Sequence, residues 1–297
     1  MKKICCIGHV TLDKIITPQT TTYLNGGTSY YFAHGISNLE NPNFQLVTSL
    51  AESEMNAIDE MRKKNLDVVV FPSEKTVYFE NKYGENSDNR SQRVLAKADP
   101  FKVDQFIPIK ADYYHLGSLL ADDFPFELVR YLSTKGIVSL DVQGYLRKVV
   151  GENVEAVDWT WKRETLKYVD ILKVNEHEMA VLTGETDVQQ AAETLAKWGV
   201  SEVIITHGSL GSYIYHDGKM IKIQAYPPKQ IVDATGCGDT YMTGYLYMRA
   251  NGASVRESGC FAAAMSTLKL EGFGPFNGTI DDIRDVVNNR RLEMDIL

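Results

Sequence analysis

Short apolar segments rich in β-branched residues alternate with amphipathic segments along most of the chain. The apolar segments predict strands at 3–10, 45–49, 68–71, 113–116, 137–141, 171–174 and 203–207. The segments between them predict helices at 28–38, 53–65, 125–134, 176–182 and 188–198. Strands that alternate with helices are typical of a mostly parallel sheet with helices on both faces. The pattern therefore predicts an α/β fold.

The pattern changes after residue 207. Segments 212–216 and 220–224 flank Asp217-Gly218, a turn that needs positive φ angles, and so predict a β-hairpin. Helices are expected at 236–251 and 254–271, and a last helix begins near Asp281.

Two polar segments with β tendency, 14–25 and 75–97, do not fit the alternation. In the second, strands at 76–80 and 93–97 flank a charged, Asn-rich loop at 81–92. We interpret both segments as a small β lid that closes over a substrate. The alternative is a surface excursion without a role. The predicted organisation is one domain, 1–297, with a lid formed by about 14–27 and 75–97.

Composition and charge exclude several classes of protein. The chain has 297 residues, 44% of them hydrophobic and 24% charged, which is typical of a soluble globular protein. A net charge of −8 argues against nucleic acid as a partner, because phosphate binding depends on Lys and Arg. The chain has no apolar segment long enough to span a membrane. Four cysteines without metal-ligand or disulfide-framework spacing lead us to expect a reducing, cytoplasmic location.

The most informative segment is Asp-Ala-Thr-Gly-Cys-Gly-Asp at 233–239, which directly precedes a helical segment. The backbone amides of Gly236, Cys237 and Gly238, at the positive end of a helix dipole, make a candidate anion site. Asp239 beside them is a candidate general base for a hydroxyl that attacks a phosphoryl group. An ordinary helix N-cap explains the same residues, so the segment alone leaves both interpretations open.

Taken with other motifs in the right order, this segment resembles the second signature of the ribokinase/PfkB carbohydrate kinase family. Gly8 and Asp13 resemble the family's N-terminal motif, and Gly26-Gly27 its first signature. Further along the chain, Asn175-x-x-Glu178 and Thr206-x-Gly208-x-x-Gly211 resemble its phosphate and nucleotide motifs. The resemblance implies a ribokinase-like three-layer sandwich, in which helices cover both faces of a mostly parallel central sheet, with a small β lid.

The resemblance also implies an ATP- and Mg²⁺-dependent kinase for a hydroxyl of a sugar or polyol, with a homodimer formed through the lid as a candidate assembly. Asp239 would be the base, and the amides of 236–238 the anion hole. The remaining roles are acceptor binding by Asp13, Gly26, Gly27, Tyr31 and Gln143; phosphate and Mg²⁺ binding by Asn175 and Glu178, the latter through water; nucleotide binding by Thr206, Gly208 and Gly211; and a candidate K⁺ site at Asp233, Thr235 and the 272–278 loop.

Two departures from the family pattern bear on the acceptor. Tyr31 stands where the family usually has an Asn that binds substrate, and a phenol cannot replace an amide's paired donor and acceptor. Asp141, Gln143 and Arg147 replace the usual Asp-x-Asn-x-Arg and resemble the plant myo-inositol kinase branch more closely. We therefore expect an inositol-like acceptor in preference to pentoses and ketohexoses.

The sequence offers two alternatives of the same fold and excludes a third class of protein. A nucleoside kinase of the same fold is the nearest alternative, and a catalytically silent binding or regulatory relative is the second. Retention of Asp239, Asn175 and Glu178 argues against the silent relative. A dinucleotide-dependent oxidoreductase would need Gly-x-Gly-x-x-Gly after the first strand, and the segment from Gly8 to Asp13 does not have it.

Overall fold

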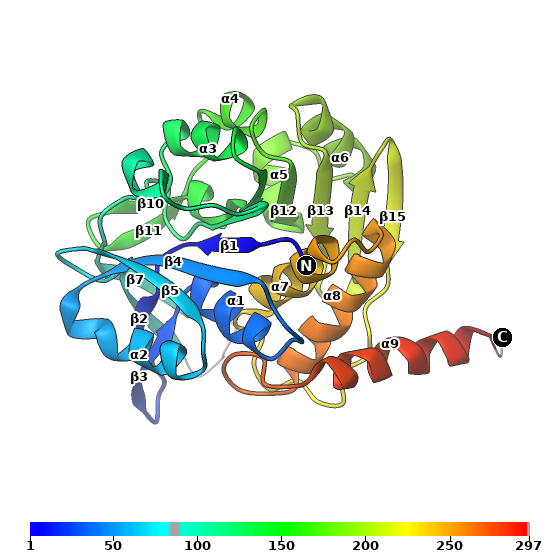
Figure 1. The fold of residues 1–297 in the computed structure, drawn as a ribbon, viewed down its shortest axis with the longest axis horizontal. Coiled ribbons are helices and arrows are strands. Elements are labelled where there is room, and N and C mark those ends of the chain that lie inside the picture. Colours follow the sequence, from blue (N-terminus) through cyan, green and yellow to red (C-terminus); the bar gives the residue numbers. More distant parts are fainter. Residues whose placement is uncertain (84–89, 296–297) are drawn as a thin grey trace.

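A nine-stranded sheet forms the centre of the computed structural model, which describes residues 1–83 and 90–295 (Figure 1). Its strands in spatial order are β15 (Lys219–Ile223), β14 (Ser212–His216), β13 (Glu202–Thr206), β12 (Ile171–Asn175), β9 (Ile137–Asp141), β8 (Tyr113–Gly117), β1 (Ile4–Ile7), β4 (Phe44–Leu50) and β5 (Asp67–Pro72). The strands from β13 to β5 are parallel, and β14 and β15 add an antiparallel hairpin at one edge. The predicted, mostly parallel sheet is confirmed.

Helices cover both faces of this sheet (Figure 1). One layer contains α1 (Thr28–Ser37), α2 (Met55–Lys63), α7 (Cys237–Ala250) and α8 (Val255–Leu270), and α9 (Ile280–Asp295) packs on the outside of α8. The other contains α3 (Phe126–Ser133), α4 (Lys162–Leu166), α5 (Glu176–Thr183) and α6 (Val188–Lys197). Because side chains alternate along a strand, Cys5 packs into one hydrophobic core and its neighbour Cys6 into the other. The result is the expected three-layer arrangement.

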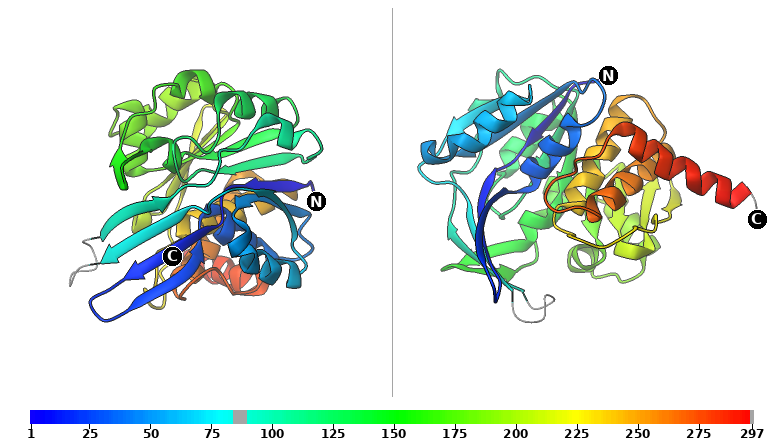
Figure 2. Two further views of the ribbon diagram at one scale, coloured as in Figure 1. Left: turned by 90° about the vertical axis from the view of Figure 1, so that its left-hand side faces the viewer. Right: turned by 90° about the horizontal axis from the view of Figure 1, so that it is seen from below.

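A second, six-stranded sheet extends from these layers, and its blue and cyan strands are seen in the left view of Figure 2. Its spatial order is β10 (Arg147–Val150), β11 (Asn153–Ala156), β7 (Arg90–Ala96), β6 (Tyr78–Tyr83), β2 (Thr11–Ile16) and β3 (Thr21–Gly26). Val77, Phe79 and Val94 pack on Leu119 and Leu120 and form a small core of their own. That this sheet acts as a lid stays a prediction, as does its pairing with a second copy.

Three details of the second sheet differ from the sequence-based prediction. Strands β6 and β7 reach into the segment 81–92 predicted as a loop, because Gln92 donates a hydrogen bond to the buried Asn81 side chain (2.9 Å) and the ladder continues. Residues 84–89 of that segment lie outside the described residues. The strands β10 and β11 were not predicted. Strand β2 begins at Thr11, directly after the predicted end of the first strand and three residues before the predicted lid segment.

Short 3₁₀ turns connect several elements: η1 (Glu52–Glu54), η2 (Val103–Phe106), η3 (Val142–Leu146) and η4 (Gly208–Leu210). Turn η3 follows β9 directly, and η4 follows β13, so both lie at the carboxyl ends of parallel strands. Within residues 1–83 and 90–295, every helix is too short or too polar to cross a lipid bilayer.

Candidate active site

The predicted site residues from four neighbouring segments meet at the carboxyl edge of the central sheet. In the register of the sheet, Asp141 at the end of β9 lies beside Lys173 of β12, and Asn175 at the end of β12 lies beside Thr206 of β13. Asp239 lies in the first turn of α7. Ligands of α/β proteins bind at this edge, so the fold places the candidate residues where a ligand site is expected.

The turn at 233–239 leads into α7 with Gly236 as the N-cap residue, at a φ of 75°. A Cβ atom on Gly236 would lie 2.2 Å from Cδ1 of Tyr31, so only glycine allows this ring to pack against the turn. The amide of Cys237 donates to Ala234 O (3.2 Å), and a bound phosphate would compete with this bond. The thiol of Cys237 points to Ser266 O of α8 (3.8 Å), so the backbone is the part of this residue available to an anion.

A buried lysine that the sequence motifs did not single out lies under this turn. Lys173 Nζ forms an ion pair with Asp141 Oδ2 at 2.9 Å, with both side chains nearly inaccessible. A Cβ atom on Gly238 would lie 3.0 Å from the same Nζ atom, which places the ammonium against the helix start. The positive charge therefore lies directly beneath the predicted anion site.

The environment of Asp239 makes it suited to accept a proton at neutral pH. Burial raises the pKa of Asp239, and the nearby Asp141 carboxylate raises it further. Lys173, a hydrogen bond from Thr28 and the charge of Arg147 act in the opposite direction, and the pKa comes to about 7. A general base works best when its pKa is near the working pH.

Asn175 and Glu178 form a reciprocal capping box at the start of α5. The Asn175 side chain accepts hydrogen bonds from the amides of His177 (2.9 Å) and Glu178 (2.8 Å), and Glu178 Oε2 accepts one from the Asn175 amide (2.8 Å). The capping box uses the single side-chain oxygen of Asn175 and one of the two carboxyl oxygens of Glu178. Burial raises the pKa of Glu178; the charge of Lys173 opposes this and that of Asp141 adds to it.

The donor set at this edge suits a magnesium ion held together with substrate phosphates. In the part of the chain that the structure describes, no group of three or more His, Cys, Asp or Glu side chains could hold a metal ion alone. Mg²⁺ is usually bound by one or two carboxylates together with waters and phosphate oxygens. Glu178, whose carboxyl group lies near Lys173 and Asp141, fits that mode of binding.

The predicted acceptor residues gather on the other side of the turn. Thr11 Oγ1 donates to Asp13 Oδ1 (2.7 Å), and a Cβ atom on Gly26 would lie 2.4 Å from Asp13 Oδ2. Gly27 has a φ of 94° and caps α1, the helix that carries Tyr31. Burial raises the pKa of Tyr31, and Asp233, Asp239 and Asp13 raise it further. The structure thus brings Asp13, Gly26, Gly27 and Tyr31 together with Asp239.

Gln143 and the predicted nucleotide-binding residues lie at the two ends of this arrangement. The backbone amide of Gln143 in η3 donates to Asp141 Oδ1 (3.3 Å), so this residue is adjacent to the buried charges. Thr206, Gly208 and Gly211 lie at the end of β13, one strand further along the edge than Asn175. A Cβ atom on Gly211 would lie 2.2 Å from Ile223 O, so the turn requires glycine there.

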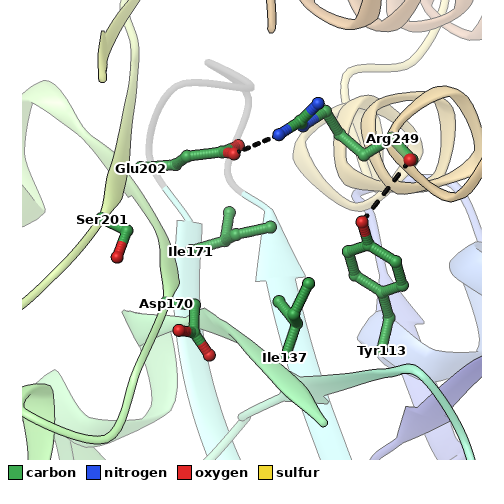
Figure 3. Close-up of a pocket in the computed structure, with 7 residues that line it drawn as sticks. All are labelled: Tyr113, Ile137, Asp170, Ile171, Ser201, Glu202 and Arg249. Carbon is green, nitrogen blue, oxygen red and sulfur yellow. Dashed lines mark hydrogen bonds and ion pairs between the residues drawn. The ribbon is translucent and has the colours of Figure 1, made fainter. Parts of the chain in front are cut away.

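A cavity of about 140 Å³ lies at the opposite, amino edge of the sheet (Figure 3). It is lined by Tyr113, Ile137, Asp170, Ile171, Ser201, Glu202 and Arg249, and includes the first residues of β8, β9, β12 and β13. The predicted catalytic and binding residues do not line it. It is therefore separate from the candidate active site.

A family comparison identifies the class of this protein as a kinase. The model of the pfkB family of carbohydrate kinases matches residues 110–281, and the chain belongs to this family. Solved structures of ribokinase-family proteins superpose on nearly the whole chain, which confirms the expected ribokinase-like fold.

Individual relatives extend over nearly the whole chain. The chain is 25% identical over 292 residues to a nucleoside kinase of Methanocaldococcus jannaschii, covering 92% of both proteins. It is 28% identical to a cytidine kinase of Thermococcus kodakarensis, covering 86% of this chain and 92% of that protein. A solved pyrophosphate-dependent kinase of the ribokinase family, complexed with a pyrophosphate analog and myo-inositol, superposes with a TM-score of 0.84 at 26% identity, covering 95% of this chain and 99% of that one.

Proposed function

We propose that the protein transfers the terminal phosphoryl group of ATP to a hydroxyl of a cyclic polyol such as an inositol, with Mg²⁺. The observation that carries the acceptor class is the position of Tyr31, whose ring packs on Gly236 and faces the charges of Asp13 and Asp239. A phenol offers an apolar face and a single hydroxyl. The C–H face of a carbocyclic ring fits that surface, while Asp13 would bind its hydroxyls.

Each step of the proposed transfer has a candidate residue. The acceptor oxygen forms a bond to the terminal phosphorus of ATP, the bond from that phosphorus to ADP breaks, and the acceptor proton goes to the Asp239 carboxylate. Asp13 and Gln143 orient the acceptor. The α7 amides and the ammonium of Lys173 stabilise the negative charge of the transferred group. Mg²⁺, held through Glu178 and water, neutralises phosphate charge when bound.

A nucleotide donor is favoured by exposed apolar side chains beside the turn. Ile231 and Val232 directly precede Asp233, and Phe273 lies next to Gly274, whose amide donates to Asp233 Oδ2 (3.4 Å). A purine base would cover such a surface, whereas pyrophosphate has no apolar part. Pyrophosphate remains the alternative donor because the solved relative with myo-inositol uses it. A nucleoside is the alternative acceptor, favoured by the two nucleoside-kinase relatives.

One matrix of assays separates these alternatives. Product formation is measured with ATP or pyrophosphate as donor and myo-inositol, ribose, fructose, adenosine or cytidine as acceptor. We expect the highest kcat/KM with ATP and myo-inositol. A best wild-type rate with ribose or fructose contradicts the proposal, a best rate with a nucleoside selects the alternative acceptor, and no transfer to any acceptor favours a catalytically silent relative.

A variant of Tyr31 tests the residue that carries the acceptor class. In Tyr31→Asn, the ratio of kcat/KM for ribose to that for myo-inositol should rise by about 10- to 100-fold. This is the discrimination expected from one contact in a binding pocket. Tyr30→Phe is the matched control, since the neighbouring ring packs on His34 (centroids 4.4 Å apart). If Tyr31→Asn leaves every ratio unchanged, Tyr31 does not contact the acceptor.

A further inference from the structure

A second fully buried lysine lies behind the active-site turn. Lys269 is near the end of α8, and its side chain has no solvent exposure. Its Nζ atom donates to the backbone oxygen of Asp233 (2.8 Å), to Asp233 Oδ2 (3.2 Å) and to the backbone oxygen of Gly272 (3.4 Å). These three bonds equal the three donors of an ammonium group.

Asp233 joins the active-site turn to the loop that follows α8. Its Oδ1 atom accepts from the Thr235 amide (2.9 Å), and its Oδ2 atom accepts from the Gly274 amide (3.4 Å). The amides of Val232 and Asp233 both donate to Leu270 O, at 2.9 and 3.3 Å. Lys269 therefore lies at the junction of the two loops, among the residues of the candidate K⁺ site.

The oxygens that Lys269 contacts, on Asp233 and Gly272, belong to two of the three parts of the candidate K⁺ site. K⁺ is bound in proteins by backbone carbonyls, and an ammonium carries the same single charge. A K⁺ ion placed on the oxygens of Asp233 and Gly272 would meet the lysine charge at contact distance, where two like charges repel strongly in a buried site. The residues present do not fit an added K⁺.

We propose that the ammonium of Lys269 replaces a monovalent metal ion in this chain, so that phosphoryl transfer does not depend on K⁺. This rests on the proposed kinase function and replaces the K⁺ activation expected from the family resemblance. The lysine holds the Asp233 and Gly272 carbonyls together and thereby fixes the turn that ends in Asp239.

The surroundings of Asp233 and α8 agree with this role. The Asp233 carboxylate forms an ion pair with the Lys269 ammonium at 3.2 Å, so the two charges match. One turn earlier on α8, Ser266 Oγ donates to the Cys237 backbone oxygen (3.0 Å), so the same helix supports both ends of the turn.

The first test compares cations at constant ionic strength. Wild-type kcat should differ by less than about twofold between K⁺ and tetramethylammonium, which is too large for the site. Lys269→Met should lose about tenfold or more of its kcat in tetramethylammonium, because the anion-binding turn is no longer fixed, and should regain most of it in K⁺. Lys197→Met, at an exposed position on α6, is the matched control and should respond as wild type does.

The second test needs no turnover. The melting temperature of Lys269→Met should rise by about 2–4 °C when K⁺ replaces tetramethylammonium, because a bound ion stabilises only the folded state, while the wild-type value stays constant. Lys269→Gln keeps a hydrogen-bond donor without the charge and should show the same rise in melting temperature. It replaces Lys269→Met in this test if the Met variant does not fold. If no acceptor is phosphorylated in any salt, the kinase proposal fails, and the melting temperatures still decide the role of Lys269.

Two results overturn the inference. One is a several-fold activation of the wild-type enzyme by K⁺ over tetramethylammonium. The other is a Lys269→Met protein whose kcat and melting temperature respond to K⁺ no more than those of wild type.

Discussion

The two edges of the central sheet both hold buried charges, and they differ in how completely these charges are paired. At the amino edge, Glu202 accepts hydrogen bonds from Arg249 (2.6 Å) and from Tyr245 Oη (2.5 Å), as the ion pair in Figure 3 illustrates. Asp170 beside it accepts from the Val138 amide (2.8 Å). The buried Glu202 is thus held in a close ion pair, and the half-buried Asp170 by a backbone amide.

At the carboxyl edge, the carboxyl groups of Asp141, Glu178 and Asp239 all lie in the field of Lys173. Asp141 forms a close ion pair with Lys173, whereas Glu178 accepts a hydrogen bond from the Asn175 amide and Asp239 one from Thr28. The pKa of Asp239 comes to about 7, because burial and Asp141 outweigh the positive charges. Three carboxyl groups gathered around one buried ammonium cost stability, so their presence in a fold indicates a function. From this comparison we expect substitutions at the carboxyl edge to change activity more than stability. Substitutions at the amino edge should change stability more than activity.

The largest effect is expected from Asp239→Asn. Loss of the general base should lower kcat by about 10²- to 10⁴-fold. The same change removes a carboxyl group that burial disfavours in its charged form, so the melting temperature should stay equal or rise. Steady-state kinetics and a thermal scan of both proteins at pH 8 check this. A variant with wild-type turnover would contradict the role of Asp239.

Lys173→Met should have the next largest effect. We expect kcat/KM to fall by about 10- to 100-fold, less than for loss of a direct oxyanion donor. Because the lysine charge lowers the pKa of Asp239, its removal should move the midpoint of the pH profile of kcat/KM upward. Lys173→Arg should restore the midpoint. If the midpoint does not move in Lys173→Met, the lysine acts only as a packing and pairing group.

The pH profile of the wild type should show a smaller change. The base must be deprotonated to accept a proton, and its pKa is about 7. The value of kcat/KM should therefore be constant above neutral pH and fall about tenfold for each pH unit below the midpoint. Initial rates between pH 5.5 and 9 test this, and a profile flat down to pH 5.5 would exclude Asp239 as the titrating base.

Glu202→Gln should have the smallest effect on activity. Removing one partner of a buried ion pair costs about 3–5 kcal/mol, so the melting temperature should fall clearly. The kcat measured well below that temperature should equal the wild-type value, because the amino edge is separate from the active site. A loss of kcat comparable to that of Lys173→Met would show that the two edges are coupled.

The central sheet could be predicted from the sequence because its strands are apolar and its helices amphipathic. The strands β10 and β11 could not, because they have four residues each, carry charged residues such as Lys148 and Glu155, and are stabilised by pairing with each other and with β7. Helix α4 has only five residues, too few for a helical periodicity. Such elements depend on tertiary contacts rather than on a local pattern.

The turn at 233–239, for which we propose a catalytic role, stands out in the sequence because its residues are contiguous, whereas the two buried lysines were not singled out. A signal for both was nevertheless present in the sequence. Lys173 interrupts a strand whose neighbours Leu172 and Val174 are fully buried, and it shares a strand face with Asn175 two residues later. Lys269 lies one helical turn after the fully buried Met265, on the same face of α8. A lysine in an otherwise apolar segment indicates a buried charge that needs a partner.

The second sheet is assembled from three separate excursions of the chain. They leave the central sheet after β1, β5 and β9, all at its carboxyl edge. The catalytic turn lies far from these excursions in the sequence and begins only after β15. An excursion that carries a proposed acceptor residue, such as Asp13 on β2, can therefore change in length or sequence without altering the segment 233–239, which carries the proposed base. This separation gives the architecture a modular route to new substrates.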